Sequence, residues 1–190
     1  MEMLINNFDD FNISRFMSTN PPSDNSFDTM QEIKELKRIP RNKRFVKEKD
    51  DITSYFKKVG ERVGVEFYPE VISEDLIEQT APIIMKLKNH YNRPRPKVLA
   101  GKIGIKLNDI EMASMKTPSY PSGHAIQGIL IGNVLATMFP LSAEDFIKAG
   151  KDISYSRNIA RAHYKSDSKF GEAIGLELYK HLKQNNNGKF

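Results

Sequence analysis

Three short segments of the sequence combine residue types and spacings that suit chemistry on a phosphate group. They lie at residues 88–96, 121–124 and 156–167 and supply lysine and arginine side chains, the two histidines His124 and His163, a carboxylate and a helix start. Fixed cations and backbone N–H groups can hold a tetrahedral oxyanion and stabilise its transition state. These segments therefore predict phosphoryl transfer to a histidine without a metal ion.

The segment Pro121-Ser-Gly-His124 predicts an anion site at a helix start. Serine is a favoured N-cap, and the first N–H groups of a helix lack intrahelical partners, so they can face a bound anion. Gly123 permits a close approach of an oxyanion to the backbone. His124 lies in the first turn, where an acid–base group could reach an ester oxygen. The alternative is an ordinary capped helix with a partly buried histidine.

The first segment offers two cations, Lys88 and Arg95. Arg95 lies between two prolines that restrict its backbone, and a preset guanidinium suits bidentate contact with phosphate. Lys86 and Arg93 have the same separation and are also followed by a proline, so the register stays open, with Lys88 and Arg95 preferred. The alternative is a solvated basic helix end.

The third segment places Arg157 before His163, and Asp167 four residues after it. A carboxylate at this spacing can accept the imidazole Nδ1–H and leave Nε2 free as a nucleophile. The alternative is an ordinary helix with a His–Asp surface pair.

Helix signals dominate the rest of the chain, and strand signals are sparse, so we expect an all-α helical bundle. Residues 97–120 read as a long loop, and Pro82 should kink or restart the helix that contains it. The expected helices are 27–36, 49–59, 73–91 capped by Ser73, a central one from Ser122 to Pro140, one capped by Ser142, and 166–182 capped by Ser166.

Length and composition indicate one domain of an ordinary soluble protein, because the chain has 190 residues, 39% of them hydrophobic. We expect an arm at 1–25, a helical domain at 26–184 and a flexible tail at 185–190. The absence of cysteine excludes disulfides and thiolate metal sites. No secretory signal and no stretch able to span a membrane are evident, which favours a cytoplasmic protein.

The formal net charge of +5 favours anionic partners or a solvated basic surface. The basic residues are spread over 34–44, 86–97 and the C-terminal tail, so nucleic-acid binding is not specifically indicated. A homo-oligomer remains open.

The pattern K-x6-R-P, P-S-G-H and S-R-x5-H-x3-D, present in this order, resembles the type 2 phosphatidic acid phosphatase superfamily. That superfamily joins bacterial class A acid phosphatases, lipid phosphate phosphatases and vanadium haloperoxidases. The resemblance is strongest to the soluble bacterial class A enzymes and implies their helical fold. It also implies hydrolysis of small phosphomonoesters with no metal cofactor and with vanadate as an inhibitor.

The resemblance assigns roles to matching positions of this chain. His163 would attack phosphorus to form a phosphohistidine, Asp167 would orient it, and His124 would protonate the leaving alcohol and later activate water. The implied phosphate-binding residues are Lys88, Arg95, Ser122, Gly123 and Arg157.

Two departures and two alternative functions accompany the resemblance. Lys165 replaces a proline common in relatives, and Ala125 replaces a threonine common in acid phosphatases. One alternative is a vanadate-dependent haloperoxidase that uses the same anion pocket. The other is a non-catalytic module that binds phosphate or nucleic acid. Substrate specificity would reside in residues 97–120, with Tyr120 as a cavity wall or as core packing.

Overall fold

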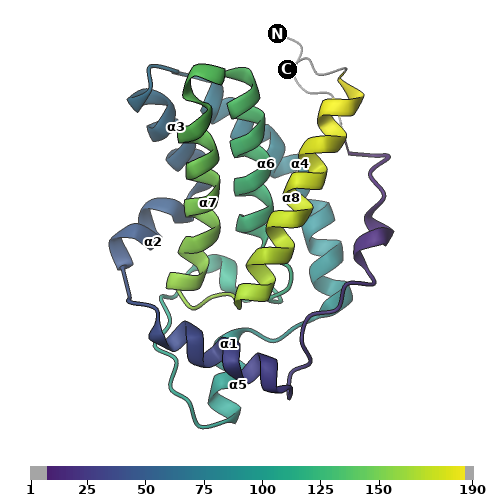
Figure 1. Ribbon diagram of the computed structural model, residues 1–190, viewed down its shortest axis with the longest axis vertical. Helices are drawn as coiled ribbons and strands as arrows, with labels where there is room; N and C mark the ends of the chain where they lie inside the picture. Colours follow the sequence, from purple (N-terminus) through teal and green to yellow (C-terminus); the bar gives the residue numbers. More distant parts are fainter. Residues whose placement is uncertain (1–7, 187–190) are drawn as a thin grey trace.

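A long apolar helix, α6 (Gly123–Met138), runs through the middle of the molecule (Figure 1). Its apolar residues face several directions, so it needs neighbours on all sides. Helices α4 (Tyr68–Tyr91), α7 (Ala143–Ile159) and α8 (Lys165–Asn185) pack around it. Its fully buried side chains include Ile126, Leu130, Ile131, Val134 and Leu135.

The computed structural model describes residues 8–186, and within that range every regular element is helical. The predicted all-α bundle is therefore confirmed. Residues 1–7 of the expected arm and 187–190 of the expected tail lie outside the described residues. The remaining elements are η1 (Ile13–Phe16), α1 (Phe27–Arg38), α2 (Lys43–Asp50), α3 (Ile52–Arg62), α5 (Pro96–Lys102), η2 (Ala113–Lys116) and η3 (Pro140–Ser142).

The described part of the N-terminal arm packs on the bundle. Phe8, Phe11 and Phe16 are buried in the main core, and the Tyr91 hydroxyl donates to the Phe16 carbonyl. Burial of three aromatic side chains fixes a segment that has little helix of its own.

The prediction of a single helix over 49–59 is wrong, because this range spans parts of two helices, α2 and α3. Asp51 lies between α2 and α3, and its Oδ1 accepts from the Ser54 amide at 2.9 Å. This N-cap starts α3 at Ile52 and separates it from α2, which begins at Lys43. The sequence pattern detected the apolar face of α3 but not the break.

The helix expected from Ser73 begins earlier, at Tyr68, so the capping role predicted for Ser73 is wrong. Its hydroxyl is buried and donates back to the Pro69 carbonyl at 2.6 Å. A serine inside a helix can make this bond to the preceding turn. The helix also continues through Pro82 to Tyr91 without restarting.

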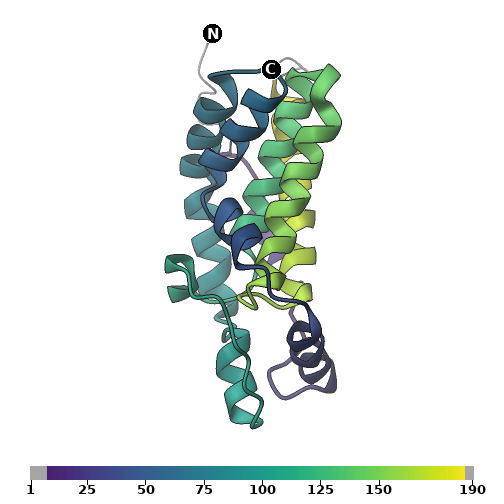
Figure 2. The ribbon, with the colours of Figure 1, turned by 90° about the vertical axis from the view of Figure 1, so that its left-hand side faces the viewer.

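Residues 97–120 are not one loop, because they contain most of α5 and all of η2. Pro96 occupies the first turn of α5, where its missing N–H costs no hydrogen bond and its fixed φ favours a helix. Pro96 therefore starts α5, and Pro94 lies in the short connection between α4 and α5. Figure 2 shows α5 and α1 beyond the same end of the bundle.

Close packing of α8 on α6 brings the two helix starts together. A Cβ on Gly171 would lie 2.6 Å from the Ser122 carbonyl oxygen, so only glycine permits this approach. The Ser122 amide donates to the Asp167 carbonyl at 3.1 Å across the same gap. Within residues 8–186, no helix is long and apolar enough to cross a membrane.

Candidate active site

A cavity of about 220 Å³ lies where α4 ends and α6 begins. Residues from all three sequence segments meet there. The predicted site residues that line it are Lys88, Arg95, Gly123, His124 and His163. The other three, Ser122, Arg157 and Asp167, are fully buried and do not line it.

His163 presents an unprotonated ring nitrogen toward a cation. Its Nδ1 lies 3.1 Å from Asp167 Oδ2, and its Nε2 lies 2.9 Å from Arg95 Nη1. A carboxylate only accepts and a guanidinium only donates, so the proton belongs on Nδ1 and the lone pair on Nε2. Burial and the Arg95 charge hold the pKa of His163 well below its usual range, which keeps the ring neutral.

Several donors hold the Asp167 carboxylate. Besides His163, it accepts from Arg93 Nη1 at 2.6 Å, from the Ser119 hydroxyl at 2.5 Å and from the Tyr164 amide at 3.1 Å. Burial raises the pKa of Asp167, and the Arg93 charge is the largest effect that opposes this rise. The bond from the Tyr164 amide also caps α8, which begins at Lys165. Asp167 therefore takes the capping role that the sequence analysis gave to Ser166, and that prediction is wrong.

Arg93 lies behind Asp167 and outside the cavity. Its Nη2 is 3.2 Å from Glu32 Oε2 on α1, and its guanidinium stacks on Tyr164 at 3.8 Å from the ring centroid. Lys86, the other member of the alternative register, is exposed. The cavity is therefore lined by Lys88 and Arg95, and Arg93 supports the carboxylate instead.

On the catalytic role that the sequence predicts for His163, replacing Arg93 with glutamine should move the acidic limb of the kcat–pH profile to higher pH. Asp167 must be ionised to hold His163, and loss of the opposing cation lets burial raise the pKa of Asp167 further. Arg93→Lys retains the charge and should shift the limb less. If both variants kept the wild-type limb and lost only thermal stability, the role of Arg93 would be structural.

Arg95 is held rigidly by carbonyl oxygens. Its Nε donates to Thr117 O at 2.8 Å, its Nη1 to Ala162 O at 2.9 Å and its Nη2 to Ser114 O at 2.9 Å. Burial lowers its pKa to about 10, so Arg95 remains a cation at neutral pH. The short segment around η2 therefore fixes the direction of one phosphate-binding candidate.

Arg157 is fully buried and has two partners that the sequence analysis did not identify. Its Nη1 lies 2.9 Å from Asp50 Oδ1, and its Nη2 lies 2.9 Å from the Ser114 hydroxyl. Asp50 is also close to His124, because its carbonyl oxygen lies 2.9 Å from His124 Nε2. No spacing rule links Asp50 or Ser114 to the three segments, since both approach through tertiary packing.

The start of α6 agrees in part with its prediction. Ser122 is the N-cap, and its hydroxyl accepts from the Ala125 amide at 3.3 Å. The Ser122 amide, expected to face phosphate, instead donates to the Asp167 carbonyl. The Gly123 amide, beside the cavity, remains available to an anion.

Two titratable groups that line the cavity, His124 and Lys88, have shifted pKa values. Burial and the Arg157 charge lower the pKa of His124 to about 3. Burial and the Arg95 charge lower the pKa of Lys88 to about 7, and its Nζ donates to the Pro118 carbonyl at 2.5 Å. Both shifts arise from cations gathered in a poorly solvated site, which is an arrangement suited to an anion.

Two residues singled out in the sequence lie away from the cavity. Lys165 pairs with Glu35 on α1 at 2.7 Å, so it adds no cation beside His163. Tyr120 is 2% exposed and stacks on Phe170, so it is core packing. Across residues 8–186, no three histidine, aspartate or glutamate side chains gather as a metal site would require.

The sequence matches the model of the PAP2 superfamily over residues 76–185. These residues include all three segments, most of α4 and all of α5 to α8, the helices that position them. The chain therefore belongs to the PAP2 superfamily, and the family resemblance drawn from the motifs is confirmed.

Curated relatives carry the names of acid phosphatases. The chain is 35% identical over 95 residues to the non-specific acid phosphatase of Salmonella typhimurium. This alignment covers 50% of this chain and 38% of that protein. It is 34% identical over 88 residues to the acid phosphatase of Zymomonas mobilis, covering 46% of this chain and 33% of the relative. These matches span well under half of each relative's length.

Proposed function

We propose that this protein hydrolyses small phosphomonoesters without a metal, through a phosphohistidine at His163. The observation that carries the proposal is that the unprotonated Nε2 of His163, backed by Asp167, shares one cavity with Lys88, Arg95 and His124. A nucleophile, an acid–base group and fixed cations are the parts that phosphoryl transfer needs. The names of the relatives, which are acid phosphatases, support the hydrolysis of phosphate esters.

Phosphate binding would rely on charges already in place. Lys88 and Arg95 line the cavity, and Arg157 lies close enough to lower the pKa of both histidines. In the free protein one Arg95 N–H is bound to His163 Nε2. A phosphate oxygen would be a better acceptor for that N–H because it is charged, so substrate binding would release the Nε2 lone pair.

The reaction would proceed in two displacements. His163 Nε2 attacks phosphorus, the bond to the leaving oxygen breaks, and His124 donates a proton to that oxygen. His124 then takes a proton from water, the water oxygen attacks phosphorus, and the P–N bond breaks to release inorganic phosphate. The low pKa of His124 means that it is neutral in the free site, so a bound phosphate dianion must raise its pKa before it can act as an acid.

The pKa of Lys88 predicts a pH dependence of substrate capture. A lysine with a pKa of about 7 loses its charge as the pH rises through that value, so kcat/KM should fall above neutrality. Lys88→Arg keeps a cation at higher pH and should move this alkaline limb upward. The measurement is kcat/KM against pH for both proteins with one substrate, and coincident alkaline limbs would contradict this role for Lys88.

A substrate panel with p-nitrophenyl phosphate and alkyl phosphates, run in EDTA with and without vanadate, tests the proposed function. We expect turnover in EDTA and competitive inhibition by vanadate, which mimics the pentacoordinate transition state. Activity that requires added Mg²⁺ or Zn²⁺ would contradict it. Oxidation of halide by vanadate-loaded protein with peroxide, without phosphate release, would favour the haloperoxidase. Binding of phosphate or nucleic acid with no turnover would favour the non-catalytic module.

A further inference from the structure

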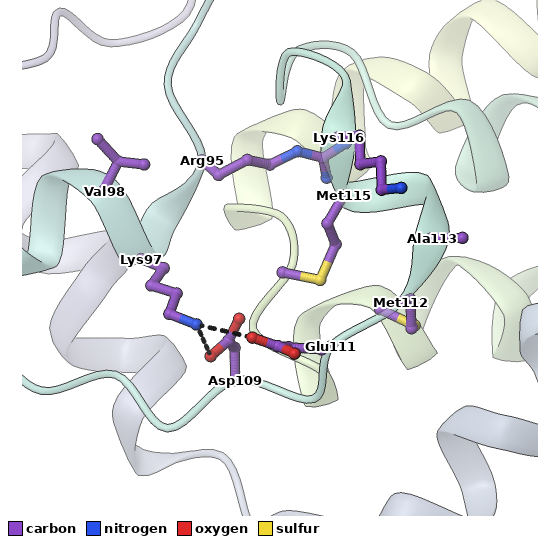
Figure 3. Close-up of a pocket in the computed structure, with 9 residues that line it drawn as sticks. All are labelled: Arg95, Lys97, Val98, Asp109, Glu111, Met112, Ala113, Met115 and Lys116. Carbon is purple, nitrogen blue, oxygen red and sulfur yellow. Dashed lines mark hydrogen bonds and ion pairs between the residues drawn. The ribbon is translucent and has the colours of Figure 1, made fainter.

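Two further cavities continue from the candidate active site along the segment before α6. The first, of about 540 Å³, shares Arg95 with the active-site cavity. Figure 3 shows it with Lys97, Asp109 and Glu111 together on one side and Arg95 and Lys116 on the other. The second, of about 340 Å³, shares Asp109 and Glu111 with the first. The first cavity therefore shares a wall with each of the other two, while the active-site cavity and the second cavity have no lining residue in common.

The carboxylates along this path already have cationic partners. Lys97 Nζ lies 3.1 Å from Asp109 Oδ1 and 3.3 Å from Glu111 Oε1. Asp50, which lines the second cavity, is paired with Arg157 at 2.9 Å. Arg157 therefore neutralises Asp50, whereas Lys97 offsets one of the two charges of Asp109 and Glu111, so a single negative charge remains to face other cations nearby.

Three cations that line the second cavity form no ion pair with any residue in 8–186. They are Arg41, Lys43 and Lys47, all exposed. Lys43 and Lys47 are four residues apart on α2, so they lie on one face of the helix, where like charges repel. A bound anion would relieve this repulsion. The basic stretch at 34–44 thus contributes to a cavity as well as to solvated surface.

This cationic cavity lies on the His124 side of the active site. Asp50 lines the cavity, and its carbonyl oxygen is the partner of His124 Nε2 at 2.9 Å. In the proposed reaction His124 protonates the leaving group, so the leaving group must lie next to this wall. A leaving group that extends past His124 would reach toward α2.

We infer that Arg41, Lys43 and Lys47 bind a second phosphate carried by the leaving group, so that small bisphosphorylated molecules are preferred substrates. The inference rests on the proposed function, because it places the first phosphate at His163. Exposed cations act over several ångströms and are screened by salt, so the preference should weaken as ionic strength rises.

The test compares a sugar bisphosphate with the corresponding monophosphate. In the variant Arg41→Gln/Lys43→Gln/Lys47→Gln, kcat/KM for the bisphosphate should fall about fivefold or more, while that for the monophosphate changes less than about twofold. The matched control is Lys34→Gln/Lys58→Gln/Lys151→Gln. It removes the same charge from exposed positions that line neither of these cavities, and it should leave the preference intact.

The possible outcomes separate the two proposals. If the wild type releases phosphate from neither sugar phosphate nor p-nitrophenyl phosphate, the proposed function itself fails. If it hydrolyses both sugar phosphates and the α2 variant affects them equally, or the control variant has the same effect, the second-phosphate site is wrong. Preference for 5′-phosphorylated oligonucleotides that grows with strand length would also overturn it, in favour of a nucleic-acid groove.

Discussion

Replacement of His163 by alanine is expected to reduce kcat by roughly 10⁴-fold or more, which is the scale for loss of a covalent nucleophile. The His163 side chain is 4% exposed, and its Nε2 is the acceptor that would form the P–N bond. The cations and the Gly123 amide remain in the variant, so vanadate should still bind. Initial rates with p-nitrophenyl phosphate and vanadate binding by calorimetry measure the two effects separately.

A matched variant guards against a folding artefact. His163→Asn is polar and smaller than histidine, and it can accept from Arg95 but offers no nucleophilic nitrogen. Both variants should unfold near the wild-type temperature while remaining inactive. Retention of more than about a tenth of the wild-type kcat in either variant would remove His163 from the proposed mechanism.

Replacement of His124 by alanine is expected to give an effect that depends on the leaving group. Alkyl alcohols leave only when protonated, so their kcat/KM should fall by about 10² to 10⁴-fold, the usual contribution of general acid catalysis. p-Nitrophenol leaves as an anion, so its kcat/KM should fall far less. The slope of log kcat/KM against leaving-group pKa should become steeper in the variant.

The control for this prediction is Ser114→Ala, which removes the hydroxyl partner of Arg157 and keeps both the carbonyl and the carboxylate of Asp50 beside His124. The control variant should lower kcat/KM by a similar factor for all substrates, because it disturbs phosphate binding and not proton transfer. An equal loss for alkyl and aryl phosphates in His124→Ala would show that His124 is not the proton donor.

Much of the fold could be predicted because short-range signals determine it. Ser26 caps α1 and Ser122 caps α6, and both serines precede an apolar pattern that the sequence displays. The predicted helix boundaries were wrong where the capping residue is less obvious, as at Asp51, or where a proline begins a helix, as at Pro96. Those choices depend on packing against other helices, which local patterns do not contain.

The candidate site divides in the same way. Residues that would touch the phosphate lie in short motifs, so their types and spacing revealed them. The residues that hold those groups come from distant parts of the chain and are joined only by folding. Glu32 on α1 accepts from both the Ser166 amide and Arg93, and Asp50 on α2 binds Arg157. Ordinary acidic residues on amphipathic helices carry no local mark of such a role.

The central claim is a covalent phosphoryl group on His163, and trapping that group tests it most directly. His124→Ala should form the intermediate from p-nitrophenyl phosphate but hydrolyse it slowly, because no base activates water. After a rapid quench at alkaline pH, peptide mass spectrometry should find one phosphoryl group on His163, stable in base and lost in acid. A phosphorylated serine, or a complete absence of label during continued turnover, would contradict the account.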